Sequence, residues 1–187
     1  MMMKGYKYMT NFLPDDYKIP TKDKYMRWKE GVNRFRVLTS PILGWEYWNE
    51  EDGKRKPIRK RMNEDLIMGD IQEPDKVKHF WALVVWNYQE DLVQILEITQ
   101  KGIQSSLRAL AKSKDWGTPL GYDVEVTRTG EGFDTKYETQ PMPKKALDKK
   151  IQAKFESMDI NLEALYNSED PFQEKLSENV KPEDIDI

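Results

Sequence analysis

Residues 79–88, HFWALVVWNY, limit the possible folds of this chain more than any other segment. The run is rich in β-branched and aromatic residues, and both alternating sets of positions are apolar, which predicts a strand. A short polar link, QED at 89–91, and a second apolar run, LVQILEI at 92–98, follow it. Two such runs with a short link predict a β-hairpin. Because a barrel strand needs only one apolar face, the other must be covered or must serve as a binding platform.

Further strands are predicted on both sides of this hairpin. Residues 33–38 alternate polar and apolar side chains, and residues 42–48 resume after a break, so we expect one long strand that bends near Pro41 and Gly44. A turn at Asp52-Gly53 leads to a strand at 56–62, in which Pro57 favours the start of the strand or the edge of the sheet. A loop is expected at 63–77. The runs 122–128 and 133–139, joined by TGEG, predict a second hairpin.

Helices are predicted where apolar residues recur at spacings of three and four. One helix should follow the 92–98 run, with Thr99 as N-cap and Ile103, Leu107 and Leu110 on one face. A C-terminal amphipathic helix should bury Leu147, Ile151, Phe155 and Met158, and a weaker helix is expected around 162–166. Only one connection between strands therefore contains a helix, which argues against a parallel α/β sheet.

This order predicts a mainly β fold, a five- to six-stranded OB-fold barrel with one helix after the fourth strand. A C-terminal helix and an acidic tail should follow the barrel. The predicted organisation is an N-terminal arm (1–30), an OB-fold core (31–143), a C-terminal helical segment (144–167) and an acidic, disordered tail (168–187).

Composition excludes several kinds of site. The 187 residues include no cysteine and one histidine, which leaves no disulfide, no thiol chemistry and no zinc site built on Cys or His. We therefore expect no metal and no cofactor. No segment approaches the ~20 apolar residues of a membrane span, and the first residues lack the apolar core of a signal peptide. A cytoplasmic protein without membrane association is expected.

Charge is distributed unevenly along the chain. The formal net charge is −3, but residues 155–187 carry ten Asp or Glu against two Lys, so the remainder has a net charge of +5. A basic body with an acidic end is typical of proteins that bind nucleic acid or use a charged interaction tail. A solvated acidic end without a partner gives the same pattern.

The densest positive charge lies beside an aromatic cluster, in residues 44–61, GWEYWNEEDGKRKPIRKR. Proteins that bind single strands combine a positive groove with aromatic stacking platforms. The candidate stacking residues are Trp45, Tyr47 and Trp48, and the candidate phosphate contacts are Lys54, Arg55, Lys56, Arg59, Lys60 and Arg61. Arg34, Arg36, Arg128 and Lys136 on other strands could extend the groove. The alternative is a core strand followed by a solvated loop. In a regular strand Trp45 and Tyr47 share one face and Trp48 has the other, so the whole cluster cannot form one platform.

The apolar hairpin strand adds two more candidates, Trp81 and Trp86, which lie on opposite faces. Either could stack on bases, unless the arm or the C-terminal helix covers its face. His79 is expected to be a packed or strand-exposed histidine. One enzymatic alternative remains: Asp123 and Glu125, with Asp134 and Lys136, weakly resemble the Mg²⁺ site of a nuclease.

Several motifs together resemble the single-stranded DNA-binding proteins of tailed bacteriophages and prophages. They are NRFRVLTSPILGWEYW, KPIR, KHFWALVVWNYQEDLVQILEITQKGIQ and the residues DWG, P, YD, V, TR and G of 115–130. The resemblance covers about residues 10–145. It implies an OB fold, sequence-independent binding of single-stranded DNA without catalysis, and a role in phage DNA replication, recombination or repair in the host cytoplasm. A more distant likeness is to the helix-destabilising protein of T4-type phages, whose zinc cannot be carried over to a chain without cysteine.

The last residues are similar to the partner-recruiting acidic tails of such proteins. They are Glu183, Asp184, Ile185, Asp186 and Ile187. The tail could recruit replication or recombination proteins through its charges, isoleucines and terminal carboxylate, or only increase solubility. An annealing factor or recombination mediator, an RNA-binding protein and a homo-oligomer stay open as alternatives.

Overall fold

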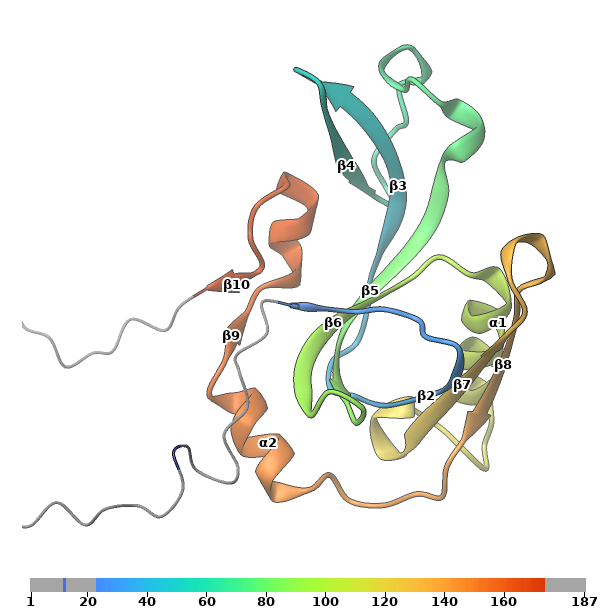
Figure 1. Ribbon diagram of the computed structural model, residues 1–187, viewed down its shortest axis with the longest axis vertical. Coiled ribbons are helices and arrows are strands. Elements are labelled where there is room, and N and C mark those ends of the chain that lie inside the picture. Colours follow the sequence, from blue (N-terminus) through green and yellow to red (C-terminus); the bar gives the residue numbers. More distant parts are fainter. Residues whose placement is uncertain (1–11, 13–22, 174–187) are drawn as a thin grey trace, which may run out of the picture.

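The computed structural model describes residue 12 and residues 23–173 (Figure 1). Most of the predicted arm and of the predicted acidic tail, including residues 183–187, lies outside the described residues. The long strands are β2 (Gly31–Val37), β3 (Ile42–Glu51), β4 (Lys54–Arg61), β5 (Lys78–Asn87), β6 (Leu92–Ile98), β7 (Asp123–Thr129) and β8 (Lys136–Pro141). The short strands are β1 (Tyr25–Met26), β9 (Asp159–Ile160) and β10 (Phe172–Gln173). The α-helices are α1 (Lys101–Lys112) and α2 (Lys149–Glu156).

The main sheet has eight strands in the order β1-β6-β5-β2-β7-β8, with β3 beside β5 and β4 outside β3. The prediction of a mainly β fold is confirmed. The closed OB-fold barrel is not confirmed, because no pairing joins the end strands β1 and β8 among the strands described. The β3–β4 hairpin extends beyond the rest of the sheet, toward the same side as the β7–β8 turn (Figure 1).

The predicted long, bent strand is present. β2 and β3 both pair antiparallel with β5, and Val37 opposes Val85 while Ile42 opposes Ala82. The five residue steps from Val37 to Ile42 therefore lie opposite only three steps on β5. The segment around Pro41 thus holds two extra residues, which bend the strand. Gly44 follows the bend, where a Cβ atom would lie 2.0 Å from the carbonyl oxygen of Lys60 on β4. Only glycine permits this approach of the two backbones.

Other local predictions also hold, with shifted boundaries. Asp52 and Gly53 have φ angles of 52° and 73°, as a two-residue type I′ hairpin turn requires. The helix after β6 buries Ile103 and Leu107, but its N-cap is Gln100 and not Thr99. The second hairpin is β7–β8, whose second strand starts later than predicted because Gly132–Asp134 form a 3₁₀ turn. The weak helix around residue 164 is a 3₁₀ helix, η5 (Leu162–Asn167).

Both faces of the β5–β6 hairpin are covered, and this settles the question raised by its apolar run. On one face Leu83 and Val85 pack with Ile103 and Leu107 of α1. The opposite face carries Phe80, Ala82, Val84 and Trp86, which pack against residues of α2, β9 and η5. Figure 1 shows α1 on one side of these strands and α2 with β9 on the other. The C-terminal segment is therefore part of the folded body. No helix in the described part of the chain is long and apolar enough to cross a membrane.

Candidate nucleic-acid interface

The β3–β4 hairpin forms the surface where exposed aromatic and basic side chains meet. Its ladder pairs Trp45 with Lys60 and Trp48 with Pro57, so alternate residues of both strands share a face. We call the face of Trp45 and Trp81, which continues toward α1, the inner face, and the face of Trp48 and Phe80 the outer face. β4 pairs only with β3 among the strands described, so it is an edge strand.

A cleft of about 530 Å³ on the outer face, the outer cleft, is lined by Glu46, Trp48, Arg55, Lys76, Lys78 and Thr99. Trp48 is 40 % exposed, and the Arg55 guanidinium lies 5.7 Å from its ring centroid. Arg55 and Lys76 both form ion pairs with Glu73 outside the cleft lining. An aromatic face beside three cations suits a base and the neighbouring phosphates.

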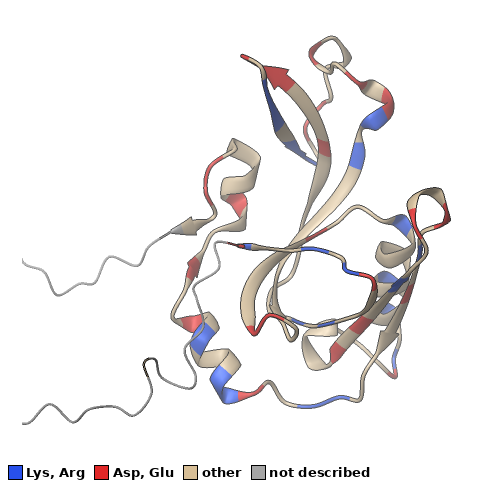
Figure 2. Cartoon of the chain, viewed as in Figure 1, with Lys and Arg blue, Asp and Glu red and all other residues tan. Residues whose placement is uncertain are grey.

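The edge strand carries cations on both of its faces. Lys54, Lys56 and Lys60 follow the inner face, whereas Arg55 and Arg61 follow the outer one. Figure 2 shows this basic strand beside the acidic end of β3. Lysines and a proline on an edge strand also prevent pairing with other sheets, and Pro57 lies on this edge as predicted. The charge therefore has a structural use whether or not a ligand is bound.

Three aromatic rings form a row on the inner face, the inner row: Trp45, His79 and Trp81. The centroids of the Trp45 and His79 rings lie 5.3 Å apart, and Trp81 Nε1 donates a hydrogen bond to His79 Nε2 at 3.2 Å. His79 Nδ1 lies 2.8 Å from the Gly44 carbonyl oxygen, so Nδ1 donates to this oxygen while Nε2 accepts from Trp81. His79 thus positions the row, as expected for a packed histidine, and both tryptophans stay partly exposed.

Two of the five predicted stacking residues are buried, and this corrects the sequence interpretation. Tyr47 is 4 % exposed and Trp86 is 8 % exposed. Trp86 packs with Ile151 of α2, and the Lys154 ammonium lies 5.4 Å from its ring centroid. Neither ring can stack on a base while these elements stay in place. Trp45, Trp48 and Trp81 remain as candidates.

Two of the predicted phosphate contacts are also buried. The Arg59 side chain is 9 % exposed and forms ion pairs with Glu46 at 2.9 Å and with Glu97 at 2.8 Å. The Arg36 side chain is 3 % exposed, pairs with Asp123 at 3.4 Å and donates to the Lys145 carbonyl oxygen at 2.8 Å. Both guanidinium groups are buried among their partners, so they stabilise the fold and are not accessible to DNA.

The remaining predicted cations differ in availability. Arg34 is partly exposed and bound to Asp123 and Glu125, and Arg128 donates to the Trp28 carbonyl oxygen at 3.2 Å. Arg61 pairs with Glu64 and Glu163, and its guanidinium lies 4.4 Å from the Tyr166 ring centroid. Lys136 is exposed on β8, apart from the β3–β4 hairpin. The exposed members of the set are Lys54, Arg55, Lys56, Arg61 and Lys136, and Lys60 is half-buried and pairs with Glu64 at 4.0 Å.

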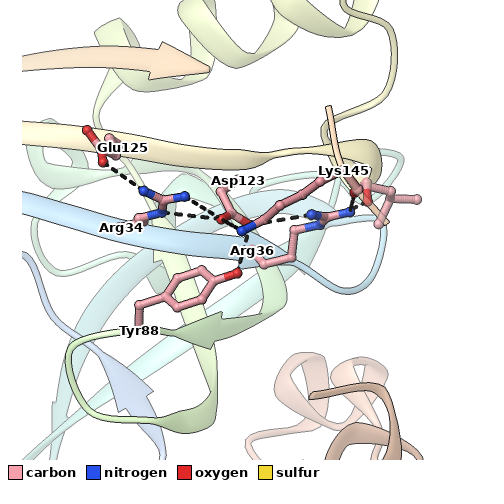
Figure 3. A network of polar contacts seen from close by, with 7 residues as sticks. Arg34, Arg36, Tyr88, Asp123, Glu125 and Lys145 are labelled. Carbon is pink, nitrogen blue, oxygen red and sulfur yellow. Dashed lines mark hydrogen bonds and ion pairs between the residues drawn. The ribbon is translucent and has the colours of Figure 1, made fainter. Parts of the chain in front are cut away.

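Asp123 is the centre of a buried polar network (Figure 3). Its carboxylate lies 2.8 Å from Arg34 Nη2, 3.4 Å from Arg36 Nη1 and 3.1 Å from Lys145 Nζ, and it accepts a hydrogen bond from the Tyr88 hydroxyl. Burial favours the neutral acid, but the hydrogen bonds from Arg34, Tyr88 and Lys145 outweigh burial and hold the pKa of Asp123 below its usual value.

These contacts argue against the nuclease interpretation of Asp123 and Glu125. A Mg²⁺ site needs open carboxylate oxygens, and here three cations already surround the Asp123 carboxylate. No cluster of three potential metal ligands occurs within the described residues. The Asp123 network instead ties β2 and β7 to the segment around Lys145.

Glu46, on the outer face of β3, shares Arg59 with Glu97. Burial is the main cause that raises the pKa of Glu46, and the hydrogen bond and charge of Glu97 add to it, so that the pKa reaches about 8. Arg59 opposes this shift. A carboxyl group with a raised pKa therefore lines the outer cleft.

The raised pKa of Glu46 predicts a pH dependence of stability. Between pH 5 and 8 the folded protein keeps a proton on Glu46 that the unfolded chain has lost, so the free energy of unfolding falls as the pH rises. Glu46→Gln cannot titrate and should flatten this fall. Thermal unfolding at pH 5, 6.5 and 8 measures the effect, with Glu50→Gln at an exposed site of the same strand as control. Equal pH profiles of wild type and Glu46→Gln would contradict the assignment.

Three exposed residues near these surfaces were missed in the sequence interpretation. Lys76 and Lys78 line the outer cleft, and Phe133 in the β7–β8 turn is fully exposed. Lys78 could have been found, because it precedes the apolar run and faces Glu46 across the ladder. Lys76 ends a 3₁₀ turn, Pro74–Lys76, in the segment predicted as a loop, and the sequence there has no periodicity that indicates its path.

Comparison with known proteins gives a distant similarity to a phage protein. No family model matches the chain, and no solved structure matches it. The chain is 22 % identical over 157 residues to a protein of Escherichia phage T5 named "Probable ssDNA-binding protein", and the alignment covers 70 % of this chain. The chain spans 60 % of the length of that relative. The similarity to phage single-stranded DNA-binding proteins that the motifs indicated is thereby confirmed as a distant one.

Proposed function

We propose that this protein binds single-stranded DNA without base specificity at the outer cleft and along the edge strand β4. The observation that carries the proposal is the outer cleft, which places the exposed Trp48 beside Arg55, Lys76 and Lys78. The name of the T5 relative supports the same ligand. The protein would act by occupancy, coating the strand and preventing re-pairing, and no catalytic step is proposed.

The binding mode follows from the two chemistries of this surface. A base would stack on Trp48, an interaction worth roughly 1–3 kcal/mol and open to every base. Phosphates would meet Arg55, Lys76 and Lys78 and then the cations of β4. Each neutralised phosphate releases condensed counterions, so affinity should fall steeply with salt concentration.

An OB-type architecture forms part of the proposal. If β2 and β3 count as one bent strand, α1 follows the fourth strand, as predicted for an OB fold. OB folds are partly open barrels that bind oligonucleotides at strands two and three and at neighbouring loops. In this count, which leaves out the two-residue β1, the second and third strands are β4 and β5, and the β3–β4 turn is a neighbouring loop. Arg55 of β4 and Lys78 of β5 line the outer cleft.

The wider role is proposed from the sequence. We place the protein in DNA replication, recombination and repair of a phage, in the host cytoplasm. Its acidic end, Glu183-Asp184-Ile185-Asp186-Ile187, would recruit replication or recombination proteins. Self-association into a homo-oligomer is compatible with this role.

Salt dependence tests the contribution of β4. The triple variant Lys54→Gln, Lys56→Gln and Lys60→Gln should bind single-stranded DNA more weakly and lower the slope of log K against log salt by about two, since each lost phosphate contact removes about 0.7. Fluorescence titration with an unstructured oligonucleotide at several salt concentrations measures the slope.

The matched control changes the same number of exposed lysines elsewhere, with Lys144→Gln, Lys149→Gln and Lys150→Gln near α2. Its slope should equal that of the wild type. Equal slopes for the β4 variant and this control would contradict a role of β4 in binding. Duplex DNA and RNA of the same length, used as competitors, show whether single-stranded DNA is the preferred ligand.

A further inference from the structure

A second cavity, of about 300 Å³, opens on the inner face and has a different chemistry from the outer cleft. Side chains of Val37, Leu43, Trp81, Leu107, Ala111 and Leu120 give it mostly apolar walls. Leu43 and Leu120 are each 40 % exposed at this cavity, which we call the inner pocket. Trp81 belongs both to the inner pocket and to the inner row.

Positive charge borders the inner pocket along α1. Arg108 of α1 lines it, and Lys101 and Lys112 lie on the same stripe of the helix, seven residues before and four residues after Arg108. All three are exposed, and within the described part of the chain no ion pair joins any of them to a carboxylate. An apolar cavity beside unpaired cations complements a ligand that is apolar at one end and anionic at the other.

Continuity with the proposed DNA surface identifies the ligand. Neighbouring strands of a sheet lie ~4.8 Å apart, and β4 is the free edge beside β3. A strand of DNA can therefore pass from the outer face over β4, between Arg55 and Arg61 on one side and Lys56 and Lys60 on the other, and reach Trp45. The inner row then leads through His79 to Trp81 at the pocket.

We infer that the inner pocket takes one unstacked base of the bound strand, with thymine preferred over uracil because the apolar walls bury its 5-methyl group, while Arg108 binds the adjacent phosphate. This inference rests on the proposed function and deepens it. The polar groups of the pocket are hydroxyls of Thr39, Ser40 and Thr118, which both donate and accept hydrogen bonds. They do not select between bases, so the apolar walls decide the preference for the 5-methyl group.

The 5-methyl group separates thymine from uracil without changing the hydrogen-bonding groups. Burial of one methyl group in the inner pocket should tighten binding about three- to fourfold. Thymidine and deoxyuridine oligonucleotides of equal length provide the comparison. Binding is measured by tryptophan fluorescence at one fixed salt concentration.

Filling the pocket tests the site directly. Ala111→Phe places a ring in the pocket from an exposed position of α1 and should bring the affinity for the thymidine oligonucleotide to within twofold of the deoxyuridine one. Ala109→Phe, exposed on the same helix outside the pocket lining, should keep the wild-type preference. Far-UV circular dichroism confirms that both variants fold.

The outcomes separate the inference from the proposed function. Equal affinity of the wild type for thymidine and deoxyuridine oligonucleotides, or an unchanged preference in Ala111→Phe, would overturn the assignment of the inner pocket as a base-binding site. Either result would leave the proposal of single-stranded DNA binding intact. Absence of binding to every oligonucleotide at low salt would overturn both. Arg108→Ala should lower the salt slope by about 0.7, and an unchanged slope would remove Arg108 from the site.

Discussion

Trp48→Ala should weaken binding of an unstructured oligonucleotide by about 5- to 150-fold, the loss expected from one base–aromatic stacking contact. Trp48 is the most suitable platform on the hairpin because it is 40 % exposed and lies among the cations of the outer cleft. Truncation removes the stacking face and leaves Arg55, Lys76 and Lys78, so the salt slope should change little. Fluorescence anisotropy of a labelled oligonucleotide measures both quantities.

Two controls distinguish stacking from a general loss of surface. Trp48→Phe keeps an aromatic face and should retain most of the affinity. Ile67→Ala removes an apolar side chain that is 65 % exposed outside the cleft lining and should have no effect. If Trp48→Ala binds as tightly as the wild type, the outer cleft is not the binding surface. The inner row with Trp45 and Trp81 would then be the remaining candidate.

The elements of this fold could be predicted where the signal is local. The apolar runs of β5 and β6, the Asp52-Gly53 turn and the interruption at Pro41 each depend on a few neighbouring residues, and each was located correctly. Closure of the sheet depends on contacts between strands far apart in the sequence. The alternation within β8 gives no indication of whether its free edge pairs with another strand.

The site was harder to predict because residues of the same type have different surroundings. Arg59 and Lys60 are neighbours in one basic run, but Arg59 faces Glu46 and Glu97 and is buried by them, whereas Lys60 faces the inner side. Tyr47 and Trp48 are neighbours as well, and the loop after β4 reaches β3 beside Tyr47. There Asn49 donates to the Asp70 carbonyl oxygen and accepts from the backbone N–H of Gln72. Only packing against distant segments decides which of the two alternating sets of side chains on a strand stays exposed.

Asp123→Ala should lower the free energy of unfolding by about 3–5 kcal/mol, because it leaves buried charge without its partner. Arg36 would lose the carboxylate while it stays 3 % exposed, and Arg34, Lys145 and the Tyr88 hydroxyl would lose the same acceptor. For a chain of this size the melting temperature should fall by about 6–20 °C. Thermal and urea unfolding measure the change.

Glu125→Ala is the matched control, because Glu125 lies two residues along β7 on the same face and pairs with Arg34 at 3.4 Å. Its side chain is 24 % exposed, so the cost should stay below about 1 kcal/mol. Oligonucleotide binding by folded Asp123→Ala should match the wild type. Asp123 lies on β7, which does not pair with β3, β4 or β5, the strands that carry the outer cleft. A cost as small as that of Glu125→Ala would show that Arg36 finds other acceptors. Loss of binding without loss of stability would instead move the DNA site to the β2–β7 side of the sheet.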